Sequence, residues 1–277
     1  MKHIPDLLWS EIEKLIPKKN KKVGRPEFDN KKAFEGVIFV LRTNTQWCEL
    51  PEKYGAYTTV HGKYMKWARA GVFDKMMVKA REYYRRRNSK NIWYAIDTLI
   101  KKAPFAKFGG KNPSDRGKRG IKQSLIVDRR GAPLFVDVAP ANKHDSGIFR
   151  ETVSKMRKSK RVRIMAADSA FDVKALRSYA KSKNIALIAA PNKRRDKTKH
   201  KFNVPCRWIV EQTFEILAWF RGLKICWSKT LISARAALQI ACSLRIFKMC
   251  GIFGLALRLR AKGSPMQILR KNILINV

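Results

Sequence analysis

Apolar residues recur at helical spacing through the first part of the chain. In KKAFEGVIFVLRT (31–43) they lie three or four positions apart, which puts their side chains on one face of a helix. The segment 58–71 reads as a second helix, because it starts with threonines that can cap it and ends at a glycine. We therefore expect residues 1–88 to form a small helical domain. The apolar positions of the first helix are Phe34, Val37, Ile38 and Leu41.

Positive charge follows one side of the second predicted helix. Lys63, Lys66 and Arg69 recur every three residues within 58–71. The preceding stretch, 49–56, has a short helix signal broken by a proline and a glycine. A short helix, a turn and a longer helix are typical of a helix-turn-helix DNA-binding unit. A plain helical bundle with a solvated basic face fits the same pattern, so both interpretations stay open, with Lys63 and Lys66 as candidate DNA contacts.

The pattern changes after the charged segment RRRNSKN (85–91). Short apolar runs then alternate with amphipathic stretches, and Arg-Arg-Gly between two of the runs is a hairpin signal. Alternating strands and helices predict the α/β class, with a mixed sheet flanked by helices over residues 89–254 and a basic tail of unclear role over 255–277. The expected strands are 92–101, 121–128, 132–140, 162–168 and 185–191, and the expected helices are 144–156, 173–184, 206–220 and 232–250.

The most apolar region of the chain, residues 231–257, contains Arg235, Gln239, Arg245 and Lys248. Charges at that spacing are expensive at the centre of a bilayer. We therefore expect a buried helix in this region, and no membrane partner.

The charge balance points to a polyanionic partner. The 277 residues include 61 Lys and Arg against 21 Asp and Glu, a formal net charge of +40. Such a charge repels itself in the compact state. Nucleic acid is the leading candidate, because neutralising phosphates releases condensed counterions and drives binding. An anionic membrane surface is the weaker alternative.

The cysteines favour a reducing compartment. There are five, an odd number, and no pair has the C-x-x-C spacing of zinc or redox motifs. The N-terminal MKHIPDLLWSEIEKLIP alternates charged with apolar residues and has no continuous signal-peptide core. Together with a nucleic-acid partner, this predicts a cytoplasmic, nucleoid-associated protein.

In so basic a chain, the places of the acidic residues are informative. Asp97 follows IWYAI inside or at the end of a predicted strand, although strands disfavour aspartate. Asp168 closes the strand RIMAAD, where ligand sites of α/β sheets lie, and it could equally cap the next helix. Glu211 lies four residues after Arg207 on the polar face of the 206–220 helix, which would also suit an ordinary surface ion pair.

Together these carboxylates suggest metal chemistry. Carboxylate oxygens suit hard divalent cations such as Mg²⁺ or Mn²⁺. Two such ions, about 3.5–4 Å apart, can activate an attacking oxygen and stabilise a leaving one during phosphoryl transfer.

Several blocks in one order make the chain resemble the DDE transposases of bacterial insertion sequences, specifically the insertion-sequence-five-like group. The resemblance covers roughly residues 4–250. It implies a ribonuclease-H-like catalytic domain whose catalytic and metal-binding triad is Asp97, Asp168 and Glu211. The blocks are GRPEFD, LRTNTQWCELPEKYG, YTTVHGKYMKWARAGVFDKM, AIDT, NPSDRGKRGIKQSLIVDRRGAPL, APANKHDS, AADSAFD and RWIVEQTFEILAWFRGL.

The resemblance also implies a mechanism and partners. Water activated by Mg²⁺ or Mn²⁺, with two ions, attacks a phosphodiester at the element end, and the resulting 3′-hydroxyl attacks target DNA. The partners are double-stranded DNA, as terminal inverted repeats and target, and a second copy of the chain in a homodimer. Arg207 would hold a DNA phosphate or Glu211. Phosphate contacts are also expected from Lys118, Arg119 and Lys122, and the pair His144–Asp145 either caps a helix or lies beside the metals.

Two alternatives stay open. A nuclease or resolvase of the same fold would share the metal-binding carboxylates but not strand transfer. A degenerate copy would bind DNA without catalysis. The N-terminal blocks favour a transposase over the first alternative, and the intact triad favours it over the second.

Overall fold

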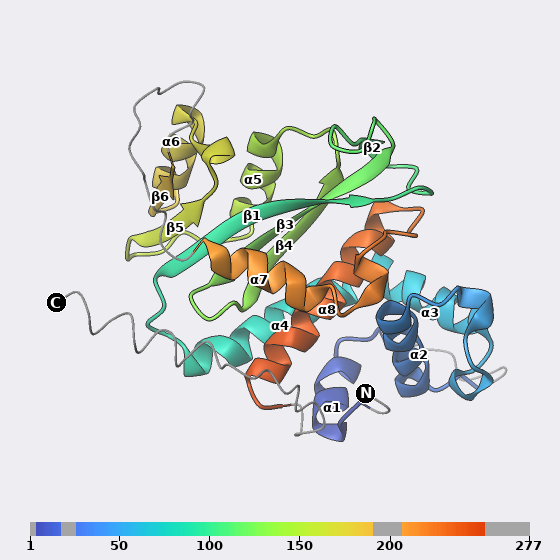
Figure 1. Ribbon diagram of the computed structural model, residues 1–277. Helices are drawn as coiled ribbons and strands as arrows, with labels where there is room; N and C mark the ends of the chain where they lie inside the picture. Colours follow the sequence, from blue (N-terminus) through green and yellow to red (C-terminus); the bar gives the residue numbers. More distant parts are fainter. Residues whose placement is uncertain (1–3, 18–25, 191–206, 253–277) are drawn as a thin grey trace, which may run out of the picture.

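The computed structural model describes residues 4–17, 26–190 and 207–252. A mixed sheet forms its centre, with α5 and α6 on one face and α4, α7 and α8 on the other (Figure 1). Each expected strand is present within one or two residues of its predicted ends. The strands are β1 (Trp93–Lys102), β2 (Gly110–Lys111), β3 (Arg119–Asp128), β4 (Pro133–Pro140), β5 (Arg163–Ala167) and β6 (Ile185–Ala189).

The order of the strands defines the fold class. Apart from the two-residue β2, the order is β4-β3-β1-β5-β6. β3 runs antiparallel to both β1 and β4, while β5 pairs in parallel with β1 and β6 in parallel with β5. A three-stranded antiparallel meander followed by two parallel strands is the ribonuclease-H-like arrangement, so the predicted fold class is confirmed.

The turn between β3 and β4 is the Arg-Arg-Gly hairpin that the sequence predicts. Asp128 Oδ1 accepts hydrogen bonds from the backbone N–H groups of Arg130 and Ala132, at 2.9 and 3.0 Å. Gly131 has a φ of +75°, which glycine adopts without the steric cost that other residues meet. Tyr84 also donates to Asp128 Oδ2, at 2.7 Å, and so ties α4 to this turn.

The N-terminal part of the described chain is helical, as expected. It contains α1 (Asp6–Glu13), α2 (Asn30–Thr43), α3 (Tyr57–Arg69) and α4 (Val72–Arg87). The short helix expected before α3 is instead two 3₁₀ turns, Trp47–Glu49 and Glu52–Tyr54. One proline and one glycine explain this difference, because Pro51 separates the two turns and Gly55 ends the second with a φ of +92°.

The remaining helices cover the sheet. They are α5 (Asp145–Ser154), α6 (Lys174–Ser182), α7 (Trp208–Leu217) and α8 (Leu231–Met249). α8 is buried along most of its length and packs against α4 and β4, so the expectation of a buried helix here is confirmed. Among the described residues, no helix has the length and apolar character needed to cross a membrane.

One hydrophobic core extends through the described chain, from Ile4 in the N-terminal part to Cys250 after α8. The helical and catalytic parts predicted from sequence therefore share a core, and the boundary near residue 88 stays a prediction. The tail predicted at 255–277 lies outside the described residues.

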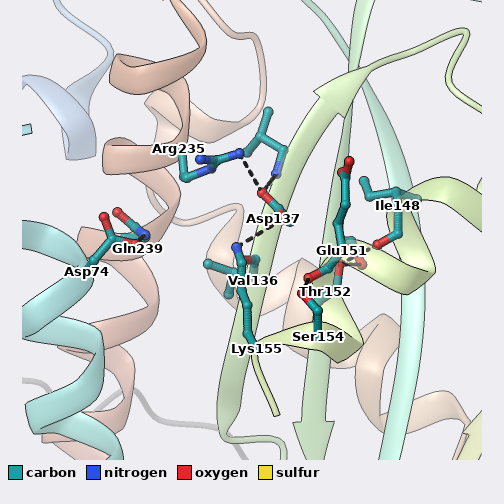
Figure 2. Close-up of polar contacts among 12 residues, drawn as sticks. Asp74, Val136, Asp137, Ile148, Glu151, Thr152, Ser154, Lys155, Arg235 and Gln239 are labelled. Atoms are coloured by element: carbon teal, nitrogen blue, oxygen red, sulfur yellow. Dashed lines mark hydrogen bonds and ion pairs between the residues drawn. The ribbon is translucent and has the colours of Figure 1, made fainter. Parts of the chain in front are cut away.

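Buried polar groups fix α8 on the edge of the sheet. Figure 2 shows Asp137 of β4 between Arg235 of α8 and Lys155, which follows α5 directly. The carboxylate lies 3.0 Å from the charged nitrogens of both cations, and its side chain is 4% exposed. Nearby, Gln239 of α8 donates to Asp74 of α4. These contacts connect β4 to α8 and to the end of α5, and they connect α8 to α4.

Candidate active site

Asp97 lies in the middle of β1 rather than at its exit, because the strand continues to Lys102. Ala95 and Ile96 before it are buried, whereas Asp97 itself is partly exposed. Its Oδ1 accepts a hydrogen bond of 2.7 Å from the backbone N–H of Thr98. Burial raises the pKa of Asp97 to about 6, and the neighbouring Arg207 opposes this shift. The carboxyl of Asp97 therefore keeps its proton to a higher pH than an ordinary aspartate does.

Asp168 comes from the adjacent strand. It follows β5, which pairs in parallel with β1 so that Ala166 lies beside Ala95. Its Oδ1 accepts a hydrogen bond of 2.7 Å from Ser169 N and caps the 3₁₀ turn Ser169–Phe171. The capping interpretation of Asp168 is therefore confirmed, and its role in a ligand site at the strand end stays a prediction.

Arg207 joins Asp168 to Glu211. Its Nη1 donates to Asp168 Oδ1 at 2.7 Å. Its Nη2 and Nε donate to Glu211 Oε1, in the first turn of α7, at 2.7 and 3.2 Å. The hydrogen bond with Glu211, and the charges of Asp168, Glu211 and Asp97, raise the pKa of Arg207. Arg207 thus contacts one carboxylate from the end of a strand and one from a helix, and the catalytic role of Asp97, Asp168 and Glu211 stays a prediction.

The chemistry of these side chains fits a divalent cation. Carboxylate oxygens are the donors that Mg²⁺ and Mn²⁺ prefer, and a cation would favour the charged form of Asp97. Across residues 4–17, 26–190 and 207–252, however, no three His, Cys, Asp or Glu side chains are close enough as they stand to hold one ion. The guanidinium of Arg207 lies between Asp168 and Glu211 and supplies the positive charge there.

Asp145 contacts β1 on the face opposite to Asp97, and His144 precedes it at the start of α5. Neighbouring side chains of a strand point to opposite faces, and Thr98, next to Asp97, donates to Asp145 Oδ1 at 3.4 Å. His144 caps α5 through its Nδ1, which accepts from Ser146 N at 3.2 Å. The capping interpretation of this pair is therefore the better one.

Lys122 is held inside the protein. Its Nζ lies 2.7 Å from Asp145 Oδ1 and 2.8 Å from the carbonyl oxygen of Lys143, and its side chain is 8% exposed. The contact with DNA phosphate expected from the sequence has no support in this arrangement, because the ammonium already has two acceptors.

The other candidate DNA contacts differ in accessibility. Lys118 and Arg119, next to β2, are exposed, and so is Lys66 on α3. Lys63 is only partly exposed. Its Nζ pairs with Glu27 at 2.8 Å and lies over the ring of Trp67. Phosphate binding by any of these residues stays a prediction.

Sequence reasoning missed two features near this site. Nothing in the spacing of residues indicated that Arg207 reaches Asp168, 39 positions away. Nor did it single out the exposed aromatic residues Phe105 and Trp227, whose rings lie 5.6 Å apart. Both contacts join segments that only the folded sheet brings together.

The fold and these carboxylates define a protein of the ribonuclease-H-like class with an acidic site at the centre of its sheet. Two family models match the chain: "Putative transposase of IS4/5 family" over residues 4–77, and "Transposase DDE domain" over residues 68–246. The second match covers more than half of the chain. The protein therefore belongs to the DDE-domain transposases of the IS4/5 type.

The chain is also similar to individual proteins. The chain is 28% identical over 144 residues to the "Putative transposase for insertion sequence element IS402" of Burkholderia cepacia, covering 49% of this chain and 66% of the relative. It is 30% identical over 96 residues to the "Uncharacterized protein y4sN" of Sinorhizobium fredii, covering 34% and 72%. Among solved structures, a piggyBac transposase synaptic complex with hairpin DNA matches with a TM-score of 0.40 and 12% identity, covering 88% and 71%.

Proposed function

We propose that this protein binds the ends of its insertion sequence and catalyses metal-dependent DNA cleavage and strand transfer, with Asp97, Asp168 and Glu211 as its catalytic residues. The observation that carries the proposal is the convergence of Asp168 and Glu211 on Arg207, with Asp97 close enough for all three charges to affect its pKa. Membership of the DDE-domain family supports the same assignment.

The three carboxylates would hold Mg²⁺ or Mn²⁺, with two ions as the family chemistry implies. Such ions, when bound, help to activate the attacking oxygen and to stabilise the leaving one. Asp97 and Asp168 would provide oxygen ligands from adjacent strands, whose rigid pairing keeps the carboxyl groups in place. Glu211 on α7 would complete the ligand set from the helix.

Arg207 would bind carboxylates in the free protein and a DNA phosphate in the complex. In the free protein its guanidinium neutralises Asp168 and Glu211. A DNA phosphate offers the same bidentate geometry as a carboxylate. We propose that Arg207 keeps the two carboxylates side by side and contacts the DNA backbone when substrate is present.

The remaining partners follow from charge and family. The net charge of +40 supports phosphate binding over a wide surface, and we propose that Lys66, Lys118 and Arg119, all exposed, take part. The DNA would be the terminal inverted repeats and a target duplex, bound by a homodimer in the cytoplasm at the nucleoid.

A strand-transfer assay tests this function. The protein is incubated with DNA that carries the element's own ends, with a target plasmid and with Mg²⁺ or Mn²⁺. We expect cut ends with 3′-hydroxyls and joined products, both abolished by a chelator. Asp97→Asn and Asp168→Asn should give neither product while still binding the DNA.

The same assay separates the alternatives. Cut ends without joined products would indicate a nuclease or resolvase. Salt-sensitive binding without any cut would indicate a copy that only holds DNA. Cleavage at nearly the full rate by either aspartate variant would contradict the role of that residue.

A further inference from the structure

Phe105 and Trp227 form an exposed aromatic pair outside the carboxylate site. Phe105 is 57% exposed and Trp227 is 48% exposed. Their ring centroids lie 5.6 Å apart with an interplanar angle of 34°. Single exposed apolar residues are ordinary, but two large aromatic rings that face solvent together can serve as a contact surface.

The fold holds both rings on ordered backbone. Ile225 forms a parallel bridge with Lys102 at the end of β1, and Cys226 N donates to the Lys102 carbonyl at 2.8 Å. Further along, Lys107 N donates to the carbonyl of Lys229 at 3.2 Å. Figure 1 shows the segment between α7 and α8 beside this end of β1. The pair is therefore a fixed feature that joins the segments 102–107 and 225–229.

The surroundings of the pair are positively charged. The exposed lysines in or next to these segments are Lys102, Lys107, Lys224 and Lys229, of which Lys102 pairs with Asp115 at 3.5 Å. Among acidic residues, the sequence has none between Asp97 and Asp115 and none after Glu215. Lysine is depleted in the cores of protein interfaces, whereas aromatic rings among basic residues are typical of sites that bind unpaired nucleotides. The charge pattern thus favours a nucleic-acid strand over a protein partner.

The pair lies beyond the end of β1, the strand that carries Asp97. From Asp97 to Lys102, β1 extends by roughly 16 Å at about 3.3 Å per residue. That is about five nucleotides at the 3.4 Å spacing of one DNA strand. Burial lowers the pKa of Lys101, and the charges of Glu215 on α7 and of Lys224 also affect this pKa. The C-terminal part of α7 therefore lies near the same end of β1.

We propose that Phe105 and Trp227 form a stacking platform for an unpaired base of a DNA strand whose phosphates contact the surrounding lysines. The proposal rests on the proposed function, because it places this base on the DNA that the carboxylates cut. A base on the platform would lie about five nucleotides or more from the scissile phosphate, so the platform would hold DNA in which pairing is locally lost.

The test measures binding without any divalent metal. A fluorescein-labelled oligo-dT strand and a duplex of equal length are titrated with the full-length protein. Stacking contributes enough per base that Trp227→Ala and Phe105→Ala should each weaken single-strand binding by about 5- to 100-fold, with duplex binding changed by less than about 3-fold. Trp227→Phe, which keeps a ring, should stay close to the wild type. Tyr57→Ala, which removes an exposed ring from α3, is the matched control and should bind the single strand normally.

Two results would overturn the proposal. One is single-strand affinity unchanged in Trp227→Ala and Phe105→Ala. The other is an equal loss for both DNA forms together with a shift from dimer to monomer in sedimentation, which would make the pair a protein interface. Failure of the proposed catalytic function would give a different result. In that case the wild type would cut no DNA, but Trp227→Ala would still bind the single strand more weakly than the wild type does.

Discussion

Asp97 is an acidic residue whose surroundings oppose its negative charge. Its carboxyl is partly buried in the middle of a strand, with buried Ala95 and Ile96 before it. This burial raises its pKa from 3.8 to about 6. A group placed at such a cost is typical of a functional site, where stability is given up for chemistry. The cost itself can be measured without DNA.

The first prediction concerns Asp97→Asn in the presence of a chelator. The folded protein binds the Asp97 proton more tightly than the unfolded chain, so the contribution of this group to stability is complete below pH 3.8 and is lost as pH rises through about 6. At pH 7 the asparagine variant should therefore be more stable than the wild type, by about 1–3 kcal/mol. Denaturant unfolding at several pH values measures this difference.

The control for this prediction is Glu215→Gln, an exposed acid one turn after Glu211. It should change the free energy of unfolding at pH 7 by less than about 0.5 kcal/mol. An Asp97→Asn protein that is less stable than the wild type at pH 7 would show that burial does not oppose the charge of Asp97.

At the scale of elements, the ion pairs of Asp137 fix how α8 sits on the sheet. β4 supplies Asp137, α8 supplies Arg235, and Lys155 follows α5 (Figure 2). Burial lowers the pKa of Lys155, and the charge of Asp137 opposes that shift. Because α8 also packs against α4, this cluster connects the sheet to the N-terminal helices.

The second prediction follows from this burial. Asp137→Ala would leave Arg235 and Lys155 without their shared carboxylate, and breaking a buried pair from one side costs about 3–5 kcal/mol. Glu151→Ala, which removes the exposed partner of Lys143, should cost less than about 1 kcal/mol. Thermal or denaturant unfolding of the two variants measures the contrast, and equal losses would mean that Asp137 is not the tie between these elements.

The elements of the catalytic part could be predicted from sequence because each is a short apolar run or an amphipathic stretch with clear ends. The two-residue β2 and the 3₁₀ turns before α3 were too short for such a signal. The triad was proposed from the family resemblance and stays a prediction. The contact of Arg207 with Glu211 could be expected from their spacing of four residues, but the hydrogen bond of Arg207 to Asp168 could not, because it depends on how α7 lies over the sheet. The burial of Lys122 was missed for the same reason, since its partner Asp145 comes from another element.

At the scale of the whole molecule, a small acidic site lies within a strongly basic protein. The net charge of +40 attracts DNA to the surface from any side, while in the proposed function cleavage requires the carboxylates at the centre of the sheet. Arg207 connects the basic surface with the acidic site, because its guanidinium can bind either a carboxylate or a phosphate. This division predicts that loss of one carboxylate abolishes cutting without abolishing binding.

The most direct measurement is the cleavage of DNA carrying the element's ends, with Mg²⁺ or Mn²⁺, by the wild type, Glu211→Gln and Glu215→Gln. Both glutamates are exposed on α7, one turn apart, but only Glu211 contacts Arg207 in the carboxylate site. We predict nicking by the wild type and Glu215→Gln, and a rate lowered by about 1,000-fold or more in Glu211→Gln, with DNA binding retained by all. Cleavage by Glu211→Gln at the wild-type rate would contradict the assignment of the catalytic triad.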